Sequence, residues 1–455
     1  MSSKSRRRQA SVAVGAALLG GLGVTLAIPG CGPLGTGAES MTAATRHLYA
    51  SASATAADPS NQQDGAGTAV GQPSPSSLPG SGSPSSSPAS ASPSDSPPPL
   101  ADSPSPIFSA FPTFSAFPGF PALLTPPSPG ASVSASPAAT APLSASGLIG
   151  FAAAELLGDD PSVQLQQLEQ MKSMGMNTVR VDADWSIGEP SQGSFDWSAL
   201  DRVMASVQQA GMTADLIIDG CPPWAAVAGA SGQFGQPASP SQFGAWAAAV
   251  AARYGSLGAD YFEIWNEPNI SQFWSPTPNP AAYTADLVAA YAAIKATAPS
   301  SVVISAGLSP AANTSSSFDP VTFFGDMYAD GAQGSFDAVG DHPYTFPADP
   351  DNDSQGAWFE MDQTRPSLRS LMIAHGDGAK KIWITEFGAP TGNVTDAQQT
   401  TELTQAITAA KDTSWIGAFY IYTWSDQDGG EGFGLLDSNG NPKPAYTAVA
   451  AALTH

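Results

Sequence analysis

Two glutamates in this sequence stand in the same local pattern. Glu267 closes the apolar run of "FEIWNEPNI" at residues 262–270, and Glu386 closes the run of "KIWITEFGAP". A carboxylate at the end of an apolar, strand-like run is costly unless a partner or a reaction uses it. Either glutamate alone could be an ordinary loop residue. As a facing pair, however, they have what cleavage of a glycosidic bond requires: a proton donor for the leaving oxygen and a nucleophile for the anomeric carbon.

The elements that must position these residues recur from residue 147 onward, with strand starts about 30 to 50 residues apart. The predicted strands are 147–152, 177–182, 213–219, 261–265, 302–306, 336–340, 382–385 and 418–424. The predicted helices are 161–174, 197–210, 241–254, 280–296, 320–329, 365–374, 395–411 and 443–453. This alternation favours parallel pairing and predicts an α/β fold, a closed (β/α)8 TIM barrel. The alternative is a doubly wound open sheet, but no glycine-rich phosphate loop follows the first strand.

In such a barrel, functional side chains gather at the C-terminal ends of the strands. Glu267 follows the fourth predicted strand and Glu386 follows the seventh, so we expect them to face each other across the mouth. Two nearby carboxylates repel, which raises the pKa of one of them and keeps it protonated. A guanidinium beside the other determines which one is ionised.

The motifs around both glutamates resemble those of glycoside hydrolase clan A, and the chain looks most like its families 39 and 5. Besides "WNEPN" and "ITEFG", similar segments are "VRVDADW", "EPSQGSFDWSALD", "CPPWA", "DHPY" and "FGLLDSNGNPKPAY". The resemblance covers about residues 147–453. It implies a retaining glycosidase that acts on O-glycosidic bonds of a poly- or oligosaccharide, with no cofactor and no metal. It does not identify the sugar or the linkage, because the clan spans many substrates.

The resemblance also implies individual roles. Glu267 would be the general acid/base and Glu386 the nucleophile. Asn266 would bond the sugar 2-hydroxyl, and Arg180 would keep the nucleophile ionised. The alternative for Arg180 is a structural salt bridge inside the barrel.

Other substrate-binding residues follow from the same comparison. His342 and Tyr344 resemble the strand-six pair beside the nucleophile, and Trp424 resembles the floor of the cleavage subsite. His342 could instead be a hydrogen-bonded structural residue, and Trp424 could be core. Loop tryptophans could stack on further sugar rings or pack under the loops. These are Trp185, Trp224, Trp274 and Trp358.

Composition divides the chain near residue 147. Residues 32–146 are dominated by Ser, Pro, Ala and Gly and cannot bury enough apolar surface to offset their ordering entropy. Residues 1–31 combine a basic stretch with an apolar run, the pattern of an export signal. Cys31 ends this segment and could carry a lipid anchor. We therefore expect a signal or anchor at 1–31, a disordered linker at 32–146, and a secreted or cell-surface barrel at 147–455.

The net charge of −23 falls almost entirely on the barrel, since the acidic and basic residues before it balance. An acidic surface disfavours nucleic acid and anionic lipid as partners and suits a neutral carbohydrate. We expect a monomer, tied to the cell envelope at most through its N-terminus. Asp426, Asp428 and Glu431 crowd the last loop, but their spacing matches no metal site. Two alternatives remain open: a transglycosylase of the envelope, and a barrel that binds carbohydrate without turnover.

The linker should be dispensable for chemistry, because a segment of this composition cannot supply a packed site. A chain that begins at Pro142 should fold and should match the activity of the full chain per mole. Circular dichroism and activity assays on both chains measure this. Loss of cooperative folding in the shorter chain would reject the proposed boundary.

Overall fold

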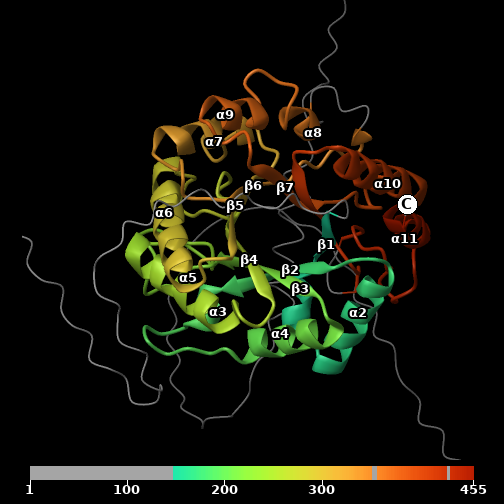
Figure 1. Ribbon diagram of the computed structural model, residues 1–455, viewed down its shortest axis with the longest axis horizontal. Helices are drawn as coiled ribbons and strands as arrows, with labels where there is room; N and C mark the ends of the chain where they lie inside the picture. Colours follow the sequence, from blue (N-terminus) through green and yellow to red (C-terminus); the bar gives the residue numbers. More distant parts are fainter. Residues whose placement is uncertain (1–146, 351–355, 428–430, 455) are drawn as a thin grey trace, which may run out of the picture. The chain divides into compact units, whose positions relative to one another are not determined.

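The computed structural model describes residues 147–350, 356–427 and 431–454. These residues form a closed barrel of parallel strands in chain order, with β1 paired to β8. The strands make an inner ring and the helices surround it (Figure 1). The predicted TIM barrel is confirmed, whereas the export signal, the linker and Cys31 lie outside the described residues. Within the described part of the chain, no helix combines the length and apolarity that a membrane span requires.

The sequence predicted the main elements and missed three short ones. The strands are Leu148–Ala152 (β1), Thr178–Asp184 (β2), Thr213–Asp219 (β3), Ala259–Asn266 (β4), Val302–Gly307 (β5), Ala338–Asp341 (β6), Lys381–Phe387 (β7) and Ile416–Ile421 (β8). The long helices are Pro161–Ser173 (α2), Ser198–Ala210 (α4), Pro240–Tyr254 (α5), Pro280–Thr297 (α6), Pro320–Ala329 (α7), Leu368–Ala374 (α9), Asp396–Asp412 (α10) and Pro444–Thr454 (α11). The short ones are Ala154–Gly158 (η1), Trp185–Gly188 (α3) and Ala357–Glu360 (α8), too brief to show a helical period.

Local sequence explains where the helices begin and end. In α4 the buried side chains recur at helical spacing and turn one face toward the strands. Gly211 then ends the helix with a φ of 66°, a conformation that glycine adopts without a steric penalty. Helix α9 begins at Leu368 rather than at Arg365, because Ser367 and Ser370 form a capping box that sets the first turn.

The apolar core has two parts. The larger cluster lies between the outer face of the strands and the helices, and it includes Phe262 of β4 and Trp246 of α5. A smaller cluster includes Ile304, Trp383 and Tyr420 of the strands and continues into the loops that follow them. Several ionisable side chains of β2, β3 and β4 are also fully or almost fully buried, among them Arg180, Asp215 and Glu263. The barrel therefore carries charge in its interior, and that charge needs partners.

Asp286 on α6 is a buried carboxyl group outside this charged layer. Neither of its oxygens has a hydrogen-bond partner among the described residues. Burial raises the pKa of Asp286 to about 8. In the unfolded chain such a group ionises near pH 4. Between these two values the unfolded state binds fewer protons than the folded state, so folding stability falls as pH rises through this window.

Asp286→Asn should therefore stabilise the protein at pH 8 and have little effect at pH 4, where the wild-type carboxyl is protonated in the folded state and about half protonated in the unfolded state. The gain at pH 8 should be a few kcal/mol, since each unit of pKa shift corresponds to about 1.4 kcal/mol. Thermal unfolding at both pH values measures it. Glu169→Gln, on the exposed face of α2, is the control and should show no such dependence. Equal stability of wild type and Asp286→Asn at pH 8 would contradict the assignment.

Candidate active site

The end of β4 departs from regular strand geometry just before the first candidate glutamate. The register with β5 skips Trp265, and both Trp265 and Glu267 have positive φ, at 71° and 45°. In a regular strand Trp265 would share the inward face with Glu263. Its ring instead packs on Trp274, in the cluster outside the barrel. This turn lets Asn266 and Glu267 face the mouth, and strained backbone of this kind concentrates at functional sites.

Glu386, near the end of β7, accepts two hydrogen bonds. Nη1 of Arg180 donates to Oε1 at 2.7 Å, and the hydroxyl of Tyr344 donates to Oε2 at 2.7 Å. Burial raises the pKa of Glu386, while the charge of Arg180 and the hydrogen bond from Tyr344 oppose that rise. Both partners stabilise the ionised carboxylate, so Glu386 is the better placed of the two glutamates to act as a nucleophile.

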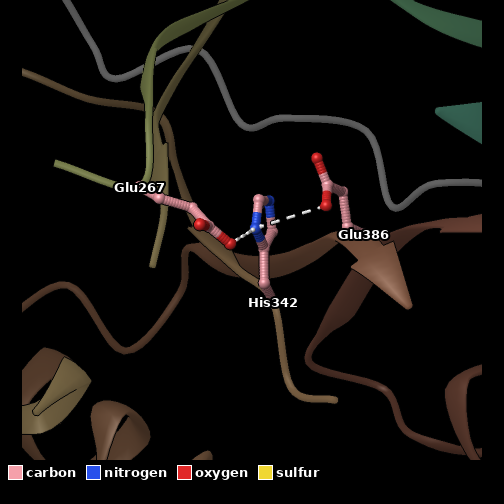
Figure 2. Close-up of side chains that lie close together, drawn as sticks. All are labelled: Glu267, His342 and Glu386. Atoms are coloured by element: carbon pink, nitrogen blue, oxygen red, sulfur yellow. Dashed lines mark hydrogen bonds and ion pairs between the residues drawn. The ribbon is translucent and has the colours of Figure 1, made fainter. Parts of the chain in front are cut away.

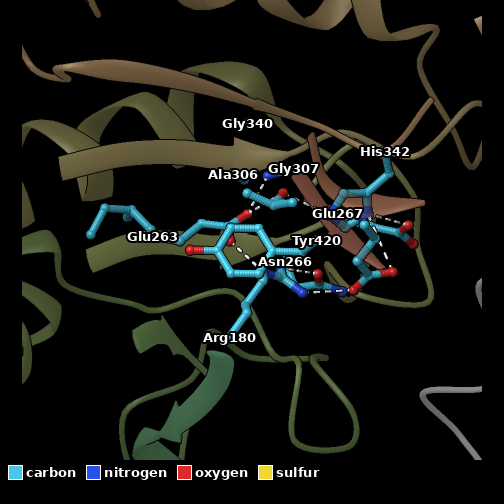
Figure 3. Close-up of polar contacts among 12 residues, drawn as sticks. Arg180, Glu263, Asn266, Glu267, Ala306, Gly307, Gly340, His342 and Tyr420 are labelled. Carbon is cyan, nitrogen blue, oxygen red and sulfur yellow. Dashed lines mark hydrogen bonds and ion pairs between the residues drawn. The ribbon is translucent and has the colours of Figure 1, made fainter. Parts of the chain in front are cut away.

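Arg180 of β2 links three side chains (Figure 3). Besides Nη1 on Glu386, its Nε donates to Oε2 of Glu263 at 2.6 Å and its Nη2 donates to Oδ1 of Asn266 at 2.9 Å. The planar guanidinium presents these donors in a fixed fork. Because the oxygen of Asn266 accepts from Arg180, its amide nitrogen is the group that can donate to a ligand.

Glu267 has a different partner. It is fully buried, and its Oε1 lies 2.9 Å from Nδ1 of His342. The imidazole lies between the two carboxylates, with Nδ1 3.7 Å from Oε2 of Glu386 (Figure 2). Burial raises the pKa of Glu267 and lowers the pKa of His342, so a protonated glutamate beside a neutral imidazole is favoured. His342, expected beside the nucleophile, lies near Glu386 and is in addition hydrogen-bonded to Glu267.

The two carboxyl groups are close together. Nδ1 of His342 and one oxygen of each glutamate lie within 4.8 Å of one another. Retaining glycosidases hold their carboxyl groups about 5 to 5.5 Å apart, and inverting ones hold them about 6.5 to 9.5 Å apart. The nearest oxygens of Glu267 and Glu386 thus lie closer together than the carboxyl groups of either class, a closeness that favours the narrower retaining arrangement.

The same three ligand atoms are near enough to share a metal ion, but their partners do not suit one. The guanidinium of Arg180 is bound to Glu386, which places a positive charge beside any cation. Nδ1 of His342 is already hydrogen-bonded to Glu267. In the last loop, Asp426 accepts from the backbone of two glycines and forms a 2.6 Å ion pair with Lys443. Asp428 lies outside the described residues. The donor sets therefore fit structural and acid/base roles better than a metal site.

The structure does not bring Trp424 to the carboxylates. It lies beyond the end of β8, fully buried, with its ring 5.1 Å from that of Phe151. The nearby aromatic residue that reaches the site is Tyr422, whose ring lies 6.5 Å from that of Tyr344. Burial and the charge of Glu386 raise the pKa of Tyr422. The sequence indicated Trp424 because the apolar run continues to residue 424. The strand instead ends at Ile421, and beyond it the ring of Tyr422 lies near Tyr344 while the ring of Trp424 packs against Phe151.

Two of the four loop tryptophans are buried in the core and two are partly exposed. Trp185 and Trp274 are fully buried and belong to the outer core cluster. Trp224 follows β3 and is half-buried, with its edge against Trp185 at 5.4 Å between ring centroids. Trp358 is also half-buried, against Phe387. Trp224 therefore keeps a partly exposed ring, as a residue that stacks on sugar would need.

Two buried residues of the site escaped the sequence analysis. Glu263 is fully buried in β4 and accepts from Arg180, from the backbone N–H of Gly307 and from the hydroxyl of Thr385. Thr385 directly precedes Glu386 on β7 and also contacts His342. A signal for Glu263 was present: it is a charged residue inside an apolar strand, the same feature that singled out Glu267. Thr385 carried no comparable signal.

Comparisons with known proteins agree with this geometry. The family model described as cellulase (glycosyl hydrolase family 5) matches residues 150–424. A comparison with curated proteins returns no match. Solved structures similar to this chain include a family 39 glycoside hydrolase from Bacteroides cellulosilyticus WH2, at 19% identity and a TM-score of 0.54, covering 68% of this chain and 63% of that one.

Two further solved structures are similar in fold. A monomeric beta-xylosidase from Caulobacter crescentus CB15 has 18% identity and a TM-score of 0.51, covering 67% of this chain and 66% of its own. A GH5_18 protein from Bifidobacterium longum subsp. infantis has 18% identity and a TM-score of 0.52, covering 68% and 78%. This chain thus spans less than two thirds of the first two structures. With the family match over most of the barrel, the chain belongs to glycosyl hydrolase family 5.

Proposed function

We propose that this protein is a retaining hydrolase of O-glycosidic bonds in a poly- or oligosaccharide, with Glu386 as nucleophile and Glu267 as general acid/base. One observation supports this most directly. The carboxyl oxygens lie within 4.8 Å of each other, and only Glu386 is bound by a guanidinium. That arrangement keeps one carboxyl group ionised and the other protonated.

In the first step the Glu386 carboxylate attacks the anomeric carbon. The bond to the leaving oxygen breaks, and Glu267 transfers its proton to that oxygen. The Nδ2 amide of Asn266 is oriented by Arg180 to donate to the sugar 2-hydroxyl, an interaction that strengthens in the transition state. The products are a glycosyl-enzyme on Glu386 and a free alcohol.

In the second step Glu267, now ionised, accepts a proton from water as the water attacks the anomeric carbon. The bond to Glu386 breaks, and the carboxylate returns to Arg180 and Tyr344. The configuration is retained because the carbon is inverted twice. A sugar acceptor in place of water would give transglycosylation. Analysis of the products from a panel of oligosaccharides separates the two outcomes.

The substrate that fits best is a neutral glycan with a β-linkage. An acidic domain repels anionic polymers, and the fold neighbour from Caulobacter crescentus is a beta-xylosidase. The partly exposed Trp224 offers an aromatic face on which a sugar ring could stack. We place the enzyme at the cell surface or in the medium, because residues 1–31 have the pattern of an export signal.

Replacing each of the two glutamates by alanine should have a different kind of kinetic effect. Glu267→Ala should slow unactivated substrates by roughly 10² to 10⁴, the usual contribution of general acid catalysis, because the leaving oxygen goes unprotonated. Activated aryl glycosides need no such help, so they should still glycosylate Glu386. The intermediate should then accumulate, because water is no longer deprotonated. Azide, which needs no base, should release it as the β-azide from a β-glycoside.

Glu386→Ala should show no burst, because no glycosyl-enzyme forms, and azide should give the inverted product. Glu402→Gln, at a buried carboxyl of α10, is the control and should keep the wild-type products. Stopped-flow kinetics and the anomeric configuration of the azides measure these effects. Rescue patterns reversed between the two alanine variants would overturn the assignment of roles.

Arg180→Met tests how Glu386 is kept ionised. Arg180 opposes the rise that burial causes in the pKa of Glu386, so without it this pKa should rise further. The acidic limb of the pH profile of kcat/KM should move to higher pH, and kcat/KM should fall by roughly 10² to 10³. Breaking the buried ion pairs should also cost about 3 to 5 kcal/mol of stability.

Arg180→Lys is the matched variant. It keeps the charge without the fork, so the limb should move less than in Arg180→Met. Thermal unfolding identifies the folded fraction of each variant. Loss of activity in folded Arg180→Met with an unmoved acidic limb would assign Arg180 a structural role only.

A further inference from the structure

The hydroxyl of Thr385 lies between two buried groups that the reaction does not use directly. Its Oγ1 is 3.0 Å from Oε1 of Glu263 and 3.1 Å from Nε2 of His342. The other ring nitrogen of His342 lies 2.9 Å from Oε1 of Glu267. All four side chains are 0% exposed, so water does not compete freely for these contacts. They form a continuous chain of hydrogen bonds from Glu263 to Glu267.

The direction of this chain follows from counting protons. Arg180 donates to Oε2 of Glu263, and the N–H of Gly307 donates to Oε1 at 2.7 Å. These donors stabilise the ionised carboxylate, which can only accept. The hydroxyl of Thr385 must therefore donate its single hydrogen to Glu263.

The oxygen of Thr385 can then only accept from His342, which places a hydrogen on Nε2. In a neutral imidazole the other nitrogen, Nδ1, has a lone pair and accepts. The group opposite Nδ1 is Glu267, so Glu267 must be the donor. The neutral form of His342 agrees with the lowering of its pKa by burial.

We propose that Glu263 and Thr385 are positioning residues that lock His342 as its Nε2–H tautomer, so that Nδ1 accepts from protonated Glu267. The proposal rests on the acid/base role of Glu267 for its catalytic meaning, although the tautomer itself does not. When Glu267 loses its proton, the lone pair of Nδ1 faces the new carboxylate. That repulsion makes the proton harder to lose in the first step and favours its recovery from water in the second.

Other charges act on the same pair from neighbouring strands. Glu386 of β7 lies 3.7 Å from Nδ1 of His342, and its negative charge also raises the pKa of Glu267. Arg180 of β2 lowers the pKa of His342, whereas Glu263 of β4 raises it. Tyr344 and Tyr422 are kept protonated by burial. Of these groups, only Glu386 lies near a ring nitrogen, and its charge favours a hydrogen on Nδ1. The direct contact of Thr385 with Nε2 acts in the opposite sense and, at 3.1 Å, is the shorter of the two.

The test reads the ring nitrogens of His342 by 15N NMR on the full chain without substrate. The chain has only four histidines, so a His342→Gln spectrum assigns the signals. In the wild type, Nε2 should carry the hydrogen and Nδ1 should be unprotonated both below and above the pH at which Glu267 ionises. A hydrogen on Nδ1, or a doubly protonated ring, while Glu267 is protonated would overturn the proposal.

Thr385→Val removes the hydroxyl and keeps the shape. Its imidazole should switch to the Nδ1–H tautomer as Glu267 ionises, since that form can donate to the carboxylate. The pH of this transition, and the basic limb of kcat/KM, should move down by about one pH unit. Thr385→Ser should restore both. Thr284→Val, at a buried threonine of α6 without a hydrogen-bond partner among the described residues, should change neither.

A folded Thr385→Val protein with the wild-type tautomer throughout and an unmoved transition would also refute the lock. If Thr385→Val does not fold, the wild-type tautomer alone decides. The two proposals fail differently. An enzyme that cleaves no glycoside can still show the Nε2–H tautomer, and then only the proposed function is wrong. If the enzyme cleaves glycosides but His342 carries its hydrogen on Nδ1 before substrate binds, the proposed function stands and only the tautomer proposal is wrong.

Discussion

The single guanidinium of Arg180 governs the site, because the barrel interior holds more carboxyl groups than it can neutralise. Its nitrogens bind Glu263 and Glu386, and those two carboxylates can therefore remain ionised without water. Asp215 and Glu267 lack such a partner, and burial raises the pKa of both. One cation thus divides these four buried carboxyl groups into two that it binds and two that it does not. A functional difference between Glu267 and Glu386 follows from that sorting.

The closed barrel makes this sorting geometrically feasible. Arg180, Glu263 and Glu386 come from β2, β4 and β7, which are distant in the chain and meet only across the barrel interior. The positive φ of Trp265 adds what a regular strand could not provide. Glu263 points into the barrel interior, where it accepts a hydrogen bond from Arg180, whereas Asn266 and Glu267 face the mouth of the barrel. The strain at Trp265 and Glu267 is balanced by packing of the tryptophan ring in the outer core.

Protonation in this site is a property of the hydrogen-bond network more than of single residues. The ion pairs determine where negative charge resides, and the contacts of Thr385 and His342 determine which way each proton points. Both effects depend on exclusion of water, because in bulk solvent each group would find other partners. Removing a residue that never touches the sugar can therefore change the acid that does.

The sequence by itself determined the barrel, the two glutamates and Arg180. Periodicity, strand ends and the motifs around Glu267 and Glu386 depend only on residues that are close together in the chain, so they can be recognised in the sequence. What only the tertiary structure decided depends on contacts between distant strands. Such contacts bond His342 to Glu267, place Glu263 behind Arg180, and put Tyr422 rather than Trp424 at the site. A strand pattern predicts where a side chain leaves the backbone. Its partner depends on the backbone conformation at the strand ends, which sets the direction of each ring and carboxylate.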